Sequence, residues 1–107
     1  MTRYRLSPEA EKDLKSIRLY LTRNGGVRVA RYVLREIRRS MRLLAESPGL
    51  GHRRSDLAEA QVKFWSVFSY LIVYDSASAP MSVIRILHGR RDVEKALQEV
   101  RPANSRP

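Results

Sequence analysis

The apolar residues of this 107-residue chain change their spacing once, near residue 60, and that change limits the folds the chain can adopt. Before it, apolar residues recur every three or four positions, the period of an α-helix that buries one face. After it, they fall into three short runs separated by turns, which is typical of β-strands. The sequence therefore predicts one α+β domain, with a helical half followed by a sheet.

The helical half begins after a short extended segment, Tyr4–Leu6. Ser7 and Pro8 mark a helix start. A serine side chain can accept a hydrogen bond from a free backbone N–H of the first turn, and proline suits the first helical position because the backbone N–H that it lacks has no intrahelical partner there. Apolar stripes at positions 10, 14, 17 and 21, and at 30, 34, 37, 41 and 44, predict two helices. The first ends at Asn24–Gly26 and the second at Ser47, before a proline. The short glycine turn predicts an antiparallel helical hairpin.

The second half predicts three strands, Val62–Val67, Tyr70–Asp75 and Met81–His88, after a polar loop over residues 50–59. The short links between the strands favour antiparallel hairpins. A short helix is expected from Asp92, and residues 101–107 have the composition of a frayed tail. The predicted order is β-α-α-β-β-β-α, a single domain over residues 1–100 with the helical hairpin on one face of a small antiparallel sheet.

Alternation along the third strand assigns its side chains to two faces. The helices need an apolar surface beneath them, so Ile84 and Ile86 are expected to face the helical hairpin, with His88 on the same side. Val83, Arg85 and Leu87 then lie on the other, open face. This alternation separates His88 from Arg85.

Composition limits the chemistry and the partners. The chain has no cysteine, so disulfides and thiolate metal sites are excluded, and a reducing cytoplasm is the expected location. It has neither a long apolar stretch that could span a membrane nor an apparent secretory signal. The net charge of +10 would attract RNA, DNA or an acidic protein segment, although a basic protein with a solvated arginine-rich helix face is the simpler interpretation.

Four segments together resemble the RelE/ParE superfamily of bacterial type II toxins, closer to the ParE branch. They occur in order over about residues 4 to 97, at positions 6–14, 43–51, 70–74 and 84–92. The resemblance implies the compact toxin fold and a hetero-oligomer with a separately encoded antitoxin whose acidic or amphipathic segment covers the toxin. ParE-type toxins act on DNA gyrase, whereas RelE-type toxins cut mRNA in the ribosomal A site. A shared fold does not choose between these targets.

A RelE-like nuclease would need groups that move protons and cations that stabilise phosphorane charge. Here Arg85 could clamp a phosphate, His88 could shuttle a proton near neutral pH, and Lys63 could add a cation. The ordinary structural interpretations are a salt bridge or antitoxin contact for Arg85, and a strand-end hydrogen bond to the backbone for His88. We expect no metal site and no cofactor, because His52 and His88 lack a carboxylate at ligand spacing and no phosphate loop occurs.

The leading hypothesis is a non-enzymatic ParE-like toxin that inhibits gyrase by protein contact and is held in check by an antitoxin. The alternatives are a ribosome-dependent mRNA endonuclease and an inactive module that only binds antitoxin. Under the leading hypothesis no residue is assigned a catalytic role. The expected partner-binding residues are Arg85, Arg90, Arg91, Trp65 and Tyr70, of which Trp65 and Tyr70 could equally belong to the core, and Arg90 and Arg91 to a solvated loop.

Overall fold

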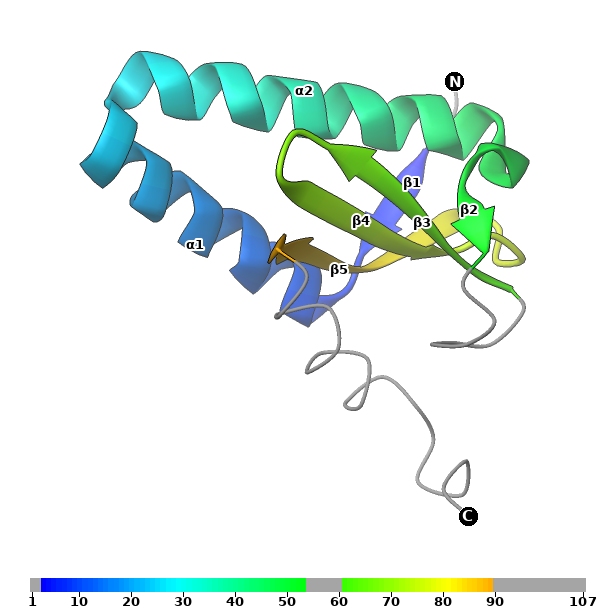
Figure 1. Cartoon of the computed structure of the whole chain (residues 1–107). Helices are drawn as coiled ribbons and strands as arrows, with labels where there is room; N and C mark the ends of the chain where they lie inside the picture. Colours follow the sequence, from blue (N-terminus) through cyan, green and yellow to red (C-terminus); the bar gives the residue numbers. More distant parts are fainter. Residues whose placement is uncertain (1–2, 54–60, 90–107) are drawn as a thin grey trace.

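The helical half forms the predicted hairpin in the computed structural model, which describes residues 3–53 and 61–89. Helix α1 spans Pro8–Gly25 and helix α2 spans Val27–Glu46. Ser7 caps α1, because its hydroxyl oxygen accepts a hydrogen bond from the N–H of Ala10 at 3.0 Å. Gly26 alone separates the helices, with φ at 91°, a left-handed conformation that favours glycine. The two helices lie on the same side of the sheet (Figure 1).

The sheet has five strands in the order β1-β5-β4-β3-β2. Strands β3 (Val62–Val67), β4 (Tyr70–Asp75) and β5 (Met81–His88) have the predicted bounds and form the predicted antiparallel meander. Strand β1 is Tyr4–Leu6, and the two-residue strand β2 is His52–Arg53. The α+β fold class and the order of elements among the described residues are therefore confirmed.

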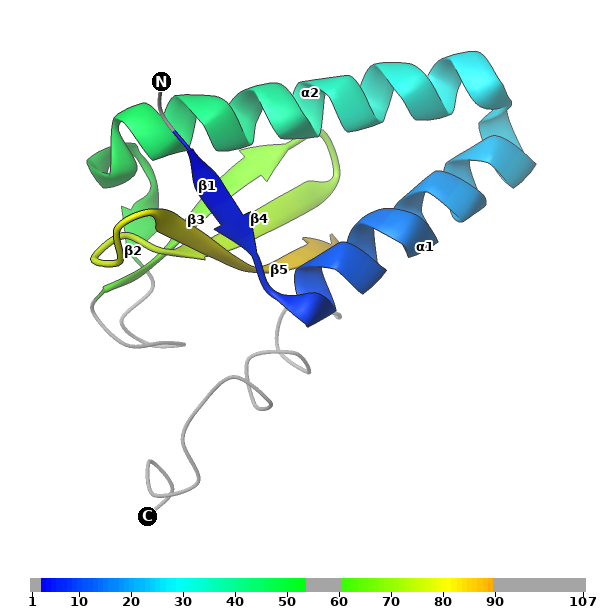
Figure 2. The same ribbon diagram turned by 180° about the vertical axis from the view of Figure 1, so that it is seen from behind.

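The sheet is mixed rather than wholly antiparallel, because β1 pairs with β5 in the parallel direction, with Tyr4 opposite Met81. Figure 2 shows β1 running beside β5. No tight turn joins these two strands, since the helical hairpin and three other strands lie between them in the sequence, so their direction is not set by a hairpin. A parallel pair of this kind leaves no short-range signal in the sequence.

The predicted polar loop over residues 50–59 contains secondary structure at its start. A 3₁₀ turn, η1 (Pro48–Leu50), precedes β2, which pairs with β3. The expected helix from Asp92 and the expected tail at residues 101–107 lie outside the described residues. The limits of a single domain over residues 1–100 remain a prediction.

The main core lies between the helices and the sheet. Alternation along β4 is regular, so Tyr70, Ile72 and Tyr74 pack against the helices while Leu71 and Val73 point to the other face. From α2 the buried side chains are those at the predicted apolar positions 30, 34, 37, 41 and 44. The helical stripes read from the sequence therefore identify the buried side of α2.

The alternation of β5 changes phase at Ile84. Tyr74 pairs with Val83 and Val73 pairs with Arg85, which leaves Ile84 as the extra residue of a β-bulge. Val83 and Ile86 consequently both face the helices, while Ile84 packs on the far side of the sheet. The prediction that Ile84 faces the helices and Val83 the other side was wrong, because a count of alternating residues does not detect a bulge.

The face of the sheet away from the helices is not open as expected. A second apolar cluster occupies it, with Val73 fully buried, Phe64 2% exposed and Leu87 3% exposed. Val62 belongs to the same cluster, and Leu71 and Ile84 pack against it. Both faces of the central strands are therefore buried, which is why β4 is apolar along most of its length.

Candidate functional site

Arg85 is held by an ion pair at the edge of β5. Its Nε donates to Oδ2 of Asp13 at 2.8 Å and its Nη2 donates to Oδ1 at 3.0 Å, so the ion pair is bidentate. The Asp13 carboxylate also accepts the backbone N–H of Ile86 at 2.9 Å. The side chains of Arg85 and Asp13 are only 19% and 15% exposed. The carboxylate thus neutralises the guanidinium, as the salt-bridge interpretation of Arg85 expected.

His88 sits on the helix side of the sheet among tyrosine rings. Its ring centroid lies 4.7 Å from that of Tyr70 on β4 and 6.1 Å from that of Tyr20 on α1. Burial, and secondarily the charge of Tyr20, raises the pKa of Tyr70, so this phenol stays protonated at neutral pH. Within residues 3–53 and 61–89, His88 makes these ring contacts rather than the expected backbone hydrogen bond.

The three residues of the nuclease alternative are not brought together. Lys63 on β3 pairs with Tyr74, whereas His88 on β5 pairs with Tyr70. These two levels are four positions apart along β4, roughly 13 Å along the strand. Arg85 points to Asp13 on α1. A phosphodiester held at the level of Lys63 would therefore lie far from His88, and the guanidinium of Arg85 is already bound by Asp13.

The two aromatic residues expected to bind a partner, Tyr70 and Trp65, differ in how deeply they are buried. Tyr70 is 6% exposed and belongs to the main core. Trp65 is partly buried against the same core, and its ring stacks on His52 with the centroids 6.3 Å apart and the planes 8° apart. Arg90 and Arg91 lie outside the described residues, so their partner roles remain predictions.

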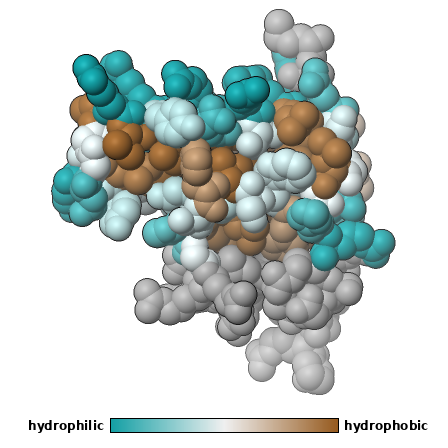
Figure 3. Space-filling view, turned by 45° about the horizontal axis from the view of Figure 1, so that its top comes forward, coloured by the Kyte–Doolittle hydropathy of each residue, from teal (hydrophilic) through white to brown (hydrophobic). Residues whose placement is uncertain are grey.

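Several exposed side chains were not found by sequence reasoning. Tyr20 and Tyr32 lie off the apolar stripes of the two helices, and Phe68 lies in the turn between β3 and β4. All three are about half exposed. For Tyr20 and Tyr32 the signal in the sequence is an aromatic residue at a position that the helical period assigns to solvent, and for Phe68 it is an aromatic residue in a tight turn. Figure 3 shows apolar surface, in brown, set among the charged residues of the helical layer.

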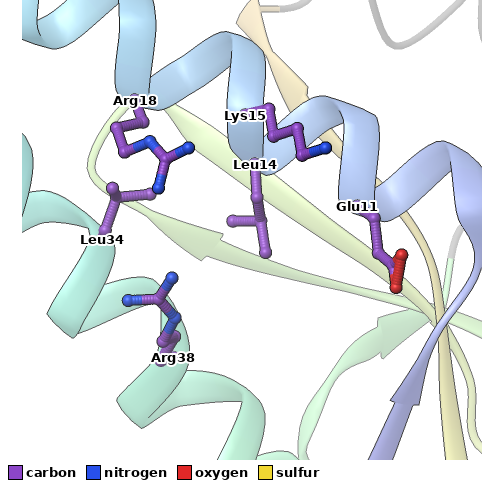
Figure 4. Close-up of a pocket in the computed structure, with 6 residues that line it drawn as sticks. All are labelled: Glu11, Leu14, Lys15, Arg18, Leu34 and Arg38. Carbon is purple, nitrogen blue, oxygen red and sulfur yellow. The ribbon is translucent and has the colours of Figure 1, made fainter.

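A shallow groove runs between α1 and α2, with a volume of about 230 Å³. Figure 4 shows its lining side chains projecting from the two helices. One carboxylate and three cations line it together with two leucines: Glu11, Lys15, Arg18, Arg38, Leu14 and Leu34. The groove is open and mostly basic, and it contains none of the candidate catalytic residues.

Two further observations concern the described residues alone. They contain no group of three or more histidine, cysteine or acidic side chains that could hold a metal ion. Neither α1 nor α2 is long and apolar enough to cross a membrane.

Comparison with known sequences decides the family. The model of the family described as "ParE toxin of type II toxin-antitoxin system, parDE" matches residues 4–93. The chain belongs to the ParE toxin family. A curated relative, Toxin ParE1 of Caulobacter vibrioides, is 32% identical over 88 residues, which cover 82% of this chain and 90% of that protein.

A solved structure has the same fold as this ParE-family chain. It is titled "Chromosomal ParDE TA system from P. aeruginosa" and superimposes with a TM-score of 0.71 at 15% sequence identity. The match covers 84% of this chain and 98% of the other. At this identity the likeness concerns the fold.

The segments that carry the ParE resemblance are joined to one another by hydrogen bonds. Ser7 donates its hydroxyl to the carbonyl of Ile84 at 2.7 Å, and Asp13 binds Arg85, so the first and last segments meet. The Tyr74 hydroxyl donates to the carbonyl of Pro48 at 2.6 Å and accepts the N–H of Gly51 at 2.9 Å, which joins the other two. These residues hold the fold together.

Proposed function

We propose that this ParE-family chain is a toxin that inhibits DNA gyrase by protein–protein contact and is neutralised by a cognate antitoxin. One observation carries the proposal within the family: the candidate acid–base residues are dispersed. Arg85 is neutralised by Asp13, and Lys63 and His88 lie at opposite ends of the β4 ladder. A protein that acts by contact needs a surface rather than a cluster of proton-transfer groups.

The antitoxin proposal is supported by charge and by exposed apolar side chains. The net charge of +10 would attract an acidic segment. Leu19, Val27 and Val29 are between 43% and 61% exposed on the helical hairpin and offer an amphipathic segment apolar contacts. The structural neighbour is titled as a ParDE system. We expect this chain to form a hetero-oligomer with its antitoxin in the cytoplasm.

The second candidate function is cleavage of ribosome-bound mRNA. The observation in its favour is that His88 lies beside Tyr70 and Tyr20. Tyr70 with its raised pKa could donate a proton but would be a poor base at neutral pH, so His88 would have to accept one. No carboxylate among the described residues contacts this group, and Arg85 points elsewhere.

Two assays run in parallel separate the candidates. Purified chain is added to gyrase with relaxed plasmid and ATP, and to translating ribosomes whose mRNA is then mapped by primer extension. The proposal predicts that supercoiling stops while the mRNA stays intact. Cleavage at A-site codons with supercoiling unaffected would show that the nuclease candidate is correct.

Lys63→Ala is a useful companion variant in both assays. Lys63 is half-buried on β3 and is not one of the residues expected to bind a partner. Inhibition of gyrase by this variant should equal that of the unaltered chain. If neither assay responds and cells grow fully without antitoxin, the chain is the inactive antitoxin-binding module and the proposal fails.

A further inference from the structure

Five rings, in two groups that each make ring contacts, extend from α1, across one end of the sheet, to α2. Tyr20 contacts His88, and His88 contacts Tyr70. Two residues before Tyr70 in the sequence, Phe68 in the β3–β4 turn contacts Tyr32 of α2, with the ring centroids 5.7 Å apart. We call this row, Tyr20, His88, Tyr70, Phe68 and Tyr32, the aromatic arc.

Most of the aromatic arc is accessible to a ligand. Tyr20 is 54% exposed, Tyr32 is 49% exposed and Phe68 is 58% exposed, and His88 is also exposed. Tyr70 is buried beneath them and supports His88. The arc therefore offers several flat ring faces to solvent on a rigid base of two strands.

The conformation of Phe68 points to a role outside folding. Its φ is 55°, in the left-handed region that is sterically unfavourable for a bulky residue. Glycine is the usual residue at such a hairpin position. Phe68 contributes little buried area in return, because more than half of it is exposed. A large ring kept at this strained, exposed position is explained if the ring binds something.

The charge around the arc is mainly positive, although Glu36, four residues after Tyr32 on α2, is a carboxylate that pairs with Arg39. Residues 14–35 contain six cations and no carboxylate: Lys15, Arg18, Arg23, Arg28, Arg31 and Arg35. Arg28, Tyr32 and Arg35 follow helical spacing and share one face of α2, and the guanidinium carbon of Arg35 lies 5.7 Å from the Tyr32 ring centre. Strands β3, β4 and β5 carry one carboxylate, Asp75, at the end of β4 opposite Tyr70.

We propose that the aromatic arc and its flanking arginines bind single-stranded nucleic acid. Exposed rings stack on unpaired bases of any sequence, and arginines bind the phosphates between them. A duplex would hide its bases from the rings, and an acidic peptide would use the cations without needing a row of flat faces. This activity is additional to the contact with gyrase and does not depend on it.

Fluorescence anisotropy tests the proposal with a labelled oligothymidylate of about 15 nucleotides, long enough to span such a surface. The full chain should bind it, and bind a duplex of the same length more weakly at equal salt. The double variant Tyr32→Ala/Phe68→Gly should lose about tenfold or more in affinity, since each stacked base contributes measurably. Thermal unfolding of the same variant checks that it is folded.

A salt titration tests the role of the arginines. Arg28→Ala/Arg35→Ala should flatten the slope of log affinity against log salt by about 1.4, because each lost single-strand phosphate contact contributes about 0.7. The control, Lys12→Ala/Arg42→Ala, removes the same charge from exposed helix positions outside residues 14–35 and should leave the slope unchanged.

Three results would overturn the inference. The first is no binding at low salt, and the second is an equal loss in the two charge variants. The third is tighter binding of a labelled acidic peptide of equal charge than of the oligonucleotide, with the same sensitivity to Tyr32→Ala/Phe68→Gly. That last result would assign the arc to a protein partner. The gyrase assay uses a separate readout, so failure of either proposal can be recognised.

Discussion

At the scale of a single residue, Asp13 provides a hydrogen-bond acceptor at the part of the β5 edge that no described strand covers. Strand β1 covers this edge only as far as the Leu6–Val83 pair, and beyond it Asp13 accepts the backbone N–H of Ile86. The same carboxylate binds Arg85, which would otherwise place a charge beside an apolar sheet. This contact joins residues 72 positions apart, so the sequence left a salt bridge and an antitoxin contact open for Arg85 and did not identify Asp13 as its partner.

Replacing Asp13 should therefore be costly. Asp13→Asn keeps an oxygen for the N–H of Ile86 but removes the negative charge that Asp13 places beside the mostly buried Arg85, so we expect a loss of about 2–4 kcal/mol in the free energy of unfolding. Urea denaturation measures it. Glu9→Gln, an exposed first-turn carboxylate of α1, is the control and should change stability by less than about 1 kcal/mol. Equal losses in the two variants would contradict this role.

The Tyr74 hydroxyl joins η1 to the sheet by hydrogen bonds, and its ionisation should lower the stability of the fold at alkaline pH. Burial raises its pKa above the usual 10.0, against an opposing effect of the Gly51 N–H. A raised pKa means that the fold favours the neutral phenol. The stabilisation is present in full below about pH 10 and is lost as the pH rises through the raised pKa.

The unfolding free energy of the unaltered chain should consequently fall more steeply above pH 10 than that of Tyr74→Phe. Denaturation at a series of alkaline pH values measures both slopes. Tyr32→Phe removes a hydroxyl from an exposed tyrosine and serves as the control. Identical slopes for the unaltered chain and Tyr74→Phe would refute the assignment.

At the scale of elements, the hydrophobic period predicted the two helices and the bounds of β3, β4 and β5. It did not predict the parallel β1–β5 pair or the bulge at Ile84, because both depend on register between distant segments. Strand β2 was missed because two residues are too few to show alternation. Of the candidate site, the salt bridge considered for Arg85 is present and its partner-binding role stays a prediction, whereas the exposed rings of Tyr20, Tyr32 and Phe68 were not identified.

The β3–β4 turn offers a test of whether Phe68 serves the fold. Phe68→Gly removes a ring but relieves the positive φ, so the free energy of unfolding should change by less than about 1 kcal/mol. The buried Phe64 of β3 is the matched comparison, and Phe64→Ala should cost about 3–5 kcal/mol. A comparable loss in Phe68→Gly would mean that the turn needs this ring for stability.

At the scale of the whole molecule, framework and surface residues are separate. The segments that carry the family resemblance meet inside the fold, through the Ser7, Asp13 and Tyr74 contacts. The charge and the exposed apolar side chains lie mainly on the helical hairpin. This division explains how one fold can serve toxins with different targets, since the surface can change while the framework is kept.

The measurement that tests the central claim most directly is a titration of gyrase supercoiling activity with the purified chain. Inhibition by contact predicts that activity falls as the chain approaches the concentration of gyrase and that the extent of inhibition does not grow with incubation time. Supercoiling that stays unchanged at a large excess of chain, or that is lost progressively at amounts far below that of gyrase, would contradict the account.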